Sequence, residues 1–201
     1  MKLLIENATI NYVSGLIKPY AATERNKPKY GCDIIIEPDT RVYELQRNPD
    51  GSWFKAITTL RGAELALANA EWKDKGRQKL DSFLATKRSI RDGNMKLDKD
   101  MDIREGYANK IYVAVKSPTP VPAYNWNNDR VGSSLEVFYS GCRISARVDL
   151  YAMTADITTQ GVFAKLTGIK FYAHGPRLDG GGVSADEFGE SPAPDDGAGM
   201  M

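Results

Sequence analysis

The stretch LEVFYSGCRISARVDLYAM, residues 135–153, decides the fold, because apolar and polar side chains alternate along most of its length. Successive side chains of a β-strand point to opposite faces, so the alternation predicts one long strand with one buried face. The apolar row contains Cys142, Ile144, Ala146, Val148 and Leu150. The opposite row contains Tyr139, Arg143, Arg147 and Tyr151, with Gly141 among them, and predicts an exposed basic and aromatic face.

Two other stretches carry the same two-faced pattern. In residues 107–117, the apolar row Ile111, Val113 and Val115 lies opposite Lys110, Tyr112 and Lys116. In residues 161–173, the apolar row Val162, Ala164 and Leu166 lies opposite Phe163 and Lys165, and beyond Gly168 the pair Ile169 and Phe171 lies opposite Lys170 and Tyr172. Together with an earlier apolar row, Cys32, Ile34 and Ile36, these stretches predict a mainly β domain.

The segments between these strands predict a helix, a hairpin and a loop. Residues 61–88 are rich in Ala, Leu, Glu, Lys and Arg with apolar residues at helical spacing, which predicts a helix interrupted near Gly76. The turn sequence Asn48-Pro49-Asp50-Gly51 predicts a hairpin within residues 43–59. Three prolines exclude a central strand from residues 117–134, which are expected to form a long loop that exposes Tyr124 and Trp126.

A near-neutral total hides an uneven distribution of charge. The chain has 27 basic and 26 acidic residues, but residues 178–201 hold six of the acidic residues and none of the basic ones. The rest of the chain therefore carries about +7 and this tail −6. The tail also has six Gly, two Pro and few aliphatic residues. This split predicts a folded domain over residues 1–177 that binds a polyanion, and a disordered acidic tail over residues 178–201.

Cations alternate with aromatic rings on three predicted strands, and single-stranded nucleic acid needs both groups. Lys and Arg follow the phosphates, while aromatic rings stack on bases with little sequence preference. Either feature alone is ordinary, since Tyr and Phe favour strands and Lys and Arg commonly solvate exposed faces. The predicted groove residues are Lys110, Tyr112, Lys116, Tyr139, Arg143, Arg147, Tyr151, Phe163 and Lys165, with Tyr124 and Trp126 as a loop platform.

Few residues suit catalysis or metal binding. His174 is the sole histidine, which excludes a multi-histidine zinc site. Asp98, Asp100 and Asp102 lack the Gly and the closing Glu of a calcium loop and predict a polar turn. We therefore expect a protein without enzyme activity, metal or cofactor.

The cysteines and the first residues of the chain indicate the cellular compartment in which the protein is expected to act. Cys32 and Cys142 lie in strand-like segments and are expected to be buried, reduced thiols. The opening residues MKLLIENATI lack the apolar core of a signal peptide, and no stretch approaches the roughly 18 apolar residues of a membrane span. These features predict a soluble protein of the cytoplasm with no membrane partner.

Several segments resemble the single-stranded DNA-binding proteins that bacteriophages encode. Near the start these are Lys27-Pro28-Lys29-Tyr30-Gly31-Cys32-Asp33-Ile34-Ile35-Ile36-Glu37-Pro38 and, in the centre, Arg91-Asp92-Gly93. The most specific segments are Phe138-Tyr139-Ser140-Gly141-Cys142-Arg143-Ile144-Ser145-Ala146, then Gly161-Val162-Phe163-Ala164-Lys165-Leu166, and then Gly175-Pro176-Arg177-Leu178-Asp179-Gly180-Gly181-Gly182. Asp186-Glu187-Phe188 resembles the acidic ending of that family.

The resemblance implies a fold and a role. It implies an OB-fold, a five-stranded Greek-key barrel that binds single strands across a strand face. It also implies protection of intermediates of DNA replication or recombination in the cytoplasm of an infected bacterium. The acidic tail would recruit replication or recombination proteins, or compete with DNA, through Asp186, Glu187, Phe188, Glu190, Asp195 and Asp196.

Other functions remain open at this point. The exposed aromatic face is also compatible with an OB-type adaptor that binds another protein instead of DNA. A nuclease that uses the Asp98 to Asp102 cluster with a divalent metal is the least supported reading. The residues are compatible with weaker binding of duplex DNA and with a homo-oligomer.

Overall fold

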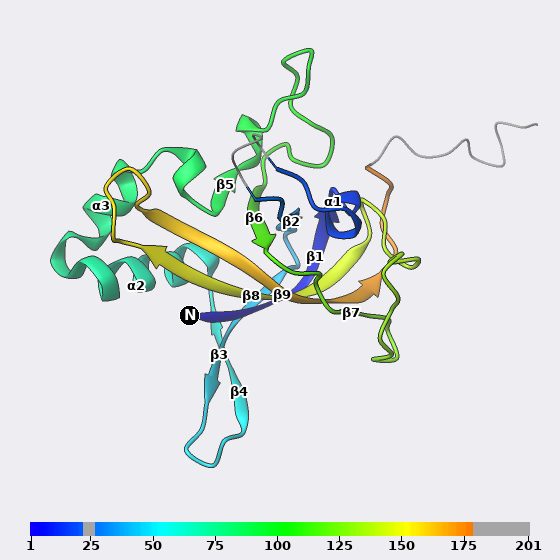
Figure 1. Ribbon diagram of the computed structural model, residues 1–201, viewed down its shortest axis with the longest axis horizontal. Coiled ribbons are helices and arrows are strands. Elements are labelled where there is room, and N and C mark those ends of the chain that lie inside the picture. The colour runs from blue at the N-terminus through cyan, green and yellow to red at the C-terminus, as the bar shows by residue number, and fades with distance from the viewer. Residues whose placement is uncertain (22–26, 179–201) are drawn as a thin grey trace, which may run out of the picture.

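The computed structural model describes residues 1–21 and 27–178 (Figure 1). The strands and helices are β1 (Lys2–Asn11), α1 (Ser14–Ile17), β2 (Tyr30–Ile35), β3 (Arg41–Arg47), β4 (Trp53–Thr58), α2 (Leu60–Trp72), α3 (Gly76–Ser82), β5 (Ile90–Asp92), β6 (Ile111–Ser117), β7 (Ala123–Tyr124), β8 (Arg143–Met153) and β9 (Gly161–Ala173). Short 3-10 turns lie at η1 (Lys73–Lys75), η2 (Ala85–Lys87) and η3 (Gly93–Met95).

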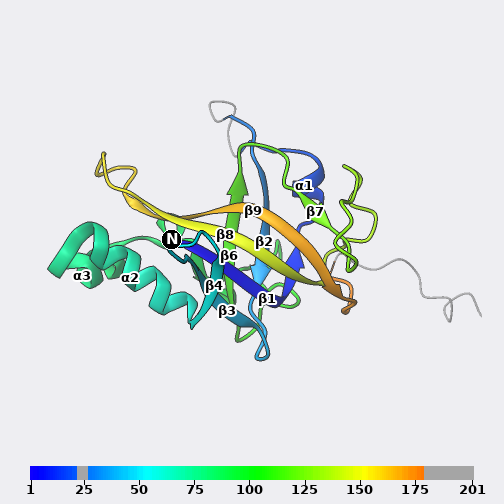
Figure 2. The same cartoon turned by 90° about the horizontal axis from the view of Figure 1, so that it is seen from below.

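Five of these strands close into a barrel in the order β1, β2, β6, β9, β8 and back to β1. All neighbouring strands are antiparallel except β6 and β9, which run parallel. In Figure 2, β2 and β6 stand across the direction of β1, β8 and β9. This five-stranded Greek-key arrangement is OB-like, so the fold predicted from the sequence is confirmed.

The apolar rows predicted on β6, β8 and β9 fill the interior of this barrel. Ile144, Ala146 and Val148 of β8 are fully buried, and Val162 and Leu166 of β9 are at most 1% exposed. The register between β8 and β9 shifts between Arg147 and Val148, opposite Gly168 and Leu166, which is where the sequence indicated a change of phase. The extra residue of this bulge keeps apolar side chains inside on both halves of β9.

Strand β1 has two different neighbours along its length. Its first half pairs with β3 and its second half with β2, and the register with β8 shifts between Ile5 and Ala8. Asn7 has a φ of 59° inside this shift, a conformation that Asn tolerates better than most residues. The bend separates β3 from the barrel, so the predicted β3–β4 hairpin projects away from it (Figure 1).

The helical insertion is interrupted as predicted. Helix α2 ends where Lys73 adopts a φ of 51°, and α3 begins at Gly76. The carboxylate of Glu64, fully buried in α2, pairs with the guanidinium of Arg88 just before β5. This ion pair fixes the insertion to the end of the barrel.

The long strand predicted over residues 135–153 is wrong in its first eight residues, because β8 begins only at Arg143. Leu135 has a φ of 52° and Gly141 a φ of 108°, and both are incompatible with an extended strand. A Cβ at Gly141 would lie 1.8 Å from the carbonyl oxygen of Pro176. The chain after β9 therefore packs on residues 140–141, and the missing side chain of Gly141 permits this close approach.

The remaining segments largely follow the sequence. The Pro-rich residues 117–134 form a loop, of which only Ala123 and Tyr124 pair with an outer part of β9. Cys32 and Cys142 are buried free thiols, and burial raises the pKa of both, that of Cys142 to about 11. Leu178 is bonded through its backbone N–H to Ser140. The predicted tail after it lies outside the described residues.

Candidate nucleic-acid interface

Two lysines lie side by side on the outside of the barrel where β6 meets β9. Lys116 and Lys165 are partners in the parallel ladder, and Lys116 also faces Gly31 of β2. Arg91 and Lys29 are near enough to Lys116 to act on its charge. We call Lys29, Arg91, Lys116 and Lys165 the basic β6–β9 surface.

The cations of this surface form no ion pairs with carboxylates among the described residues, although Asp149 lies opposite Lys165 in the ladder. Burial lowers the pKa of Lys116, and repulsion from Arg91 and Lys29 lowers it further, against a small opposing effect of Asp33. Within residues 1–21 and 27–178, none of the ion pairs involves Lys29, Lys116 or Lys165. Clustered like charges are unfavourable by themselves, and a bound anion relieves their repulsion.

An aromatic pair lies next to these cations on the same outer face. Tyr151 of β8 and Phe163 of β9 are opposite each other in the ladder, two residues from the pair of Asp149 and Lys165. Their ring centroids are 6.0 Å apart with a 37° tilt, and Tyr151 is 43% exposed. Its burial on one side raises the pKa of the Tyr151 hydroxyl. The combination of cations and a half-exposed ring is the one that the sequence predicted.

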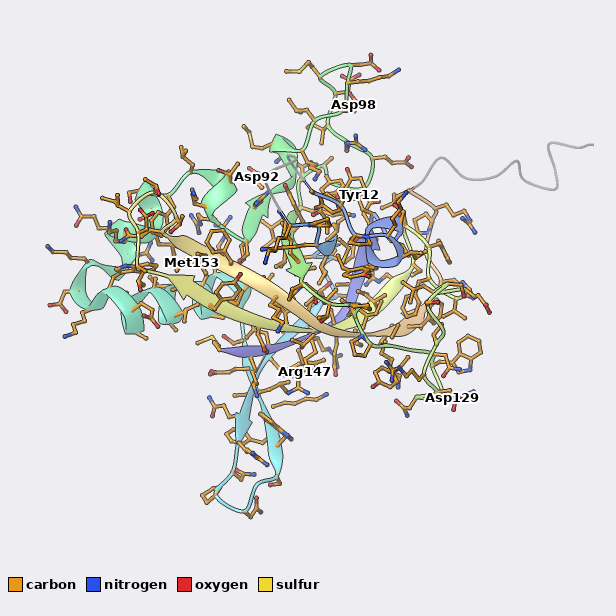
Figure 3. The ribbon with its side chains drawn as sticks, in the orientation of Figure 1. Tyr12, Asp92, Asp98, Asp129, Arg147 and Met153 are labelled. Carbon is orange, nitrogen blue, oxygen red and sulfur yellow. The ribbon has the colours of Figure 1, made fainter. Side chains whose placement is uncertain are left out.

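A second cluster of cations and an aromatic ring lies on the β3–β4 hairpin, and the sequence reasoning missed it. The indole of Trp53 is 47% exposed. Lys2 Nζ lies 4.9 Å from its ring centroid, Arg147 Cζ 5.4 Å and Arg47 Cζ 5.7 Å. Figure 3 places Arg147 at the base of the hairpin. We call Lys2, Arg47, Trp53 and Arg147 the hairpin tryptophan cluster.

The sequence contained only part of the signal for this cluster. Arg47 and Trp53 flank the predicted turn and pair across the hairpin, so their contact could be inferred from a register. Lys2 and Arg147 come from β1 and β8, and the first half of β1, which pairs with β3 on one side and with β8 on the other, brings them beside the hairpin.

The strand predicted from residue 107 begins only at Ile111, and two predicted groove residues, Lys110 just before β6 and Tyr112 within it, have partners inside the protein. Lys110 forms an ion pair of 2.8 Å with Glu37. Tyr112 is on the predicted outer face but only 4% exposed, because the ring of Tyr107 packs edge-on against it at 5.1 Å. The expectation that Tyr112 is an exposed ring is therefore wrong.

Tyr139 and Arg143 also have structural partners. Tyr139 lies outside β8, its ring stacks on His174 at 6.0 Å, and its hydroxyl donates to the carbonyl of Gly175 at 3.0 Å. Arg143 donates to the side-chain and backbone oxygens of Asn7, each at 2.8 Å, and pairs with Asp39. The hydrogen bond from Arg143 lowers the pKa of Asp39. Both side chains hold loops against the barrel.

The loop platform is present but lies apart from the basic β6–β9 surface. Tyr124 and Arg147 line a cavity of about 500 Å³, together with Lys170 and Tyr172 of β9. Trp126 is 56% exposed and packs edge-on against Phe171 at 5.8 Å. Arg147 thus connects this cavity with the hairpin tryptophan cluster.

Residues after β5 cover part of the outer face of β2 and β6. The ammonium of Lys96 bonds to Asp33 at 2.8 Å and lies 4.9 to 5.8 Å from the rings of Tyr12, Tyr107 and Tyr112. Beside it is a cavity of about 530 Å³, which Tyr12, Lys18, Tyr20 and Asp33 help to line. The covered part of this face explains why Tyr112 is not available for stacking.

Within the described residues, the acidic turn is not a metal site and the helices are not membrane spans. Asp98 accepts hydrogen bonds from the backbone N–H groups of Asp100 and Asp102, as in the predicted polar turn. Among the described residues, no three His, Cys, Asp or Glu side chains are grouped to hold a metal ion. In the same part of the chain, every helix is too short or too polar to cross a membrane.

Comparison with known proteins identifies similar proteins from bacteriophages. A family model described as the ssDNA-binding protein of Enterobacter phage Enc34 matches residues 1–198. "Putative protein p50" of Acyrthosiphon pisum secondary endosymbiont phage 1 is 28% identical over 192 residues, which cover 94% of this chain and 92% of that protein.

The solved structures most relevant to the fold come from the same phage. The single-stranded DNA-binding protein of bacteriophage Enc34 in complex with ssDNA has a TM-score of 0.57 and 14% identity, covering 88% of this chain and 89% of that chain. A C-terminal truncation of that protein has a TM-score of 0.55 and 15% identity, covering 88% and 87%. The family match spans nearly the whole sequence, and the barrel is the one found in these structures. The chain therefore belongs to the family of the ssDNA-binding protein of Enterobacter phage Enc34.

Proposed function

We propose that this protein binds single-stranded DNA without acting on it chemically, and that the basic β6–β9 surface holds the phosphates. The observation that carries the proposal is the pairing of Lys116 with Lys165, which places two cations beside Tyr151 and Phe163, neither of them in an ion pair within the described residues. Membership of a family whose namesake binds ssDNA supports it.

The geometry supports a division of roles. Lys116 and Lys165 attract phosphates, while the exposed ring of Tyr151, supported by Phe163, stacks on a base. Stacking on an aromatic ring contributes about 1–3 kcal/mol per base and suits any base. Lys110, Tyr112, Tyr139 and Arg143 shape the barrel and its loops instead. An OB-type adaptor that binds only proteins would need neither the unbalanced cations nor this pairing with an aromatic ring.

Titration of labelled oligo-dT, oligo-dA and duplex DNA into the full chain at two salt concentrations tests the proposal. Binding of both single strands, weaker binding of duplex and a clear loss of affinity at the higher salt concentration are expected. Affinity that does not respond to salt, or duplex bound as tightly as single strands, would contradict it.

The proposal extends to the acidic tail and its partners. Asp186, Glu187, Phe188, Glu190, Asp195 and Asp196 form a tethered polyanion that competes weakly for the basic surface and is released to replication or recombination proteins when DNA binds. This would take place in the cytoplasm of an infected bacterium. A chain that ends at Leu178, whose backbone is bonded to Ser140, should bind oligo-dT more tightly at low salt than the full chain. If the full chain and the shortened chain bind oligo-dT equally well, the tail does not compete with DNA and its proposed role is limited to recruiting partner proteins.

A further inference from the structure

We propose that the hairpin tryptophan cluster is a second nucleotide-binding platform for single-stranded DNA, separate from the basic β6–β9 surface and centred on Trp53. The inference rests on the proposed function, because it assigns a further contact to the same ligand. It adds a stacking site on an element outside the barrel.

Three elements bring cations to one ring. Lys2 belongs to β1, Arg47 to β3 and Arg147 to β8, yet all three lie 4.9 to 5.7 Å from the indole centroid of Trp53. Such a convergence depends on the bend of β1 and the projection of the hairpin (Figure 1). Within the described part of the chain, none of the ion pairs involves any of these three cations.

The three cations around Trp53 are close enough to repel one another. A cation over an exposed ring gains little stability, while neighbouring cations at the protein surface repel one another. A bound nucleotide can interact with the indole and with all three cations at once. Its base stacks on the exposed indole, and the long side chains of the cations turn to the phosphates on either side.

The surroundings of Trp53 suit an unstacked base. Strand β4 has a partner on one side only, since β3 is its sole neighbour in the described sheet. Ile57, on the same face of β4 beyond Lys55, is a further exposed apolar side chain, at 82% exposure. Lys55 lies over the ring of Tyr43 at 5.2 Å and pairs with Glu6, so the neighbouring aromatic is already covered.

Arg147 gives this platform a connection to the rest of the protein. It contacts Trp53 on one side and lines the cavity of Tyr124, Lys170 and Tyr172 on the other. It stands on β8 four residues before Tyr151. A strand of DNA that leaves Tyr151 along the outer face of β8 therefore meets Arg147 and then Trp53.

The test compares full-length Trp53→Ala, Trp53→Phe and Phe54→Ala in binding to short and long oligo-dT. Phe54 is a matched control, because it is 41% exposed but points to the other face of the same strand. Trp53→Ala is expected to weaken binding of the long oligonucleotide roughly 5- to 150-fold, the loss of one stacked base, with little effect on the shortest oligonucleotide that binds. Trp53→Phe and Phe54→Ala are expected to retain most of the affinity.

A second readout follows the indole directly. In full-length Trp72→Phe/Trp126→Phe protein, Trp53 is the only indole left of the three in the chain. Its emission should be quenched by long oligo-dT at the concentration where anisotropy reports binding. If wild-type protein binds oligo-dT but Trp53→Ala binds it equally well, this inference is overturned and the proposed function stands. The same holds if oligo-dT binds without quenching the emission of Trp53. Wild-type protein that binds no oligo-dT would overturn both.

Discussion

Lys116 of β6 and Lys165 of β9 are direct partners in the one parallel pairing of the barrel. The closure of the barrel forces this contact, because β6 and β9 are far apart in sequence and meet only as neighbours in the ring. Two ammonium groups in this position repel each other unless an anion lies between them. Under the proposed function, this pairing is the site that holds phosphate, and neither strand carries both cations alone.

The lowered pKa of Lys116 predicts a pH effect on DNA binding. Phosphates favour the charged form of this lysine, so affinity should be full at neutral pH and fall as the pH rises through the lowered pKa. Arginine stays charged throughout, so Lys116→Arg should lose less affinity than wild type as the pH rises from neutral toward the ordinary pKa of a lysine. Anisotropy with oligo-dT measures both. Identical pH profiles would show that Lys116 does not contact the ligand.

Replacement of the exposed ring on β8 separates stacking from polar contact. Tyr151→Ala should weaken oligo-dT binding by about 1–3 kcal/mol, while Tyr151→Phe should retain nearly all of the affinity. The hydroxyl contributes little to stacking, and the ring of Phe163 supports either aromatic side chain. Equal losses in the two variants would point to the hydroxyl instead of the ring.

Arg143 is expected to act on stability and not on DNA. Its hydrogen bonds to Asn7 hold the bend of β1, so Arg143→Ala should lower the free energy of unfolding by about 1–3 kcal/mol. Urea unfolding measures this loss, with the exposed Arg41→Ala as the control. The salt dependence of oligo-dT binding should remain that of wild type. A shallower salt dependence in Arg143→Ala would instead show that Arg143 contacts DNA, as the sequence predicted.

Breaking the ion pair of Glu64 and Arg88 is expected to lower the stability of the protein more than the loss of Arg143 does. Arg88→Ala leaves the carboxylate of Glu64 buried without its partner, so a loss of about 3–5 kcal/mol of stability is expected. Glu64→Gln, which removes the buried charge, should be less damaging. Thermal melts of the two variants test this order, and equal melting temperatures would contradict it.

The barrel strands were predictable because the alternation of apolar and polar residues within each strand shows which of its side chains are buried. The row of Ile144, Ala146 and Val148 alternates with polar residues, and such alternation needs no knowledge of the neighbouring strands. Tyr112 shows the limit of this reasoning. Its face was predicted correctly, but a segment that comes before β6 covers it with Tyr107, and no local pattern reports such a contact.

The candidate site was predictable to the same extent. Lys116, Lys165, Tyr151 and Phe163 each follow from strand phase, and the structure brings them together on adjoining strands. Trp53 was missed because two of its three cations come from β1 and β8. Tyr139 was misplaced because the backbone turns at Gly141, and the alternation of residue types continued across that turn.

The salt dependence of oligo-dT binding in Lys116→Ala/Lys165→Ala tests the central claim most directly. Wild type is expected to show a slope of log K against log salt near −3.5, for about five phosphate contacts at roughly −0.7 each. The double variant should be shallower by about 1.4, whereas Lys73→Ala/Lys99→Ala, which removes the same charge from exposed positions elsewhere, should match wild type. An unchanged slope in Lys116→Ala/Lys165→Ala, or an equal change in the control, would contradict the assignment of phosphate binding to the basic β6–β9 surface.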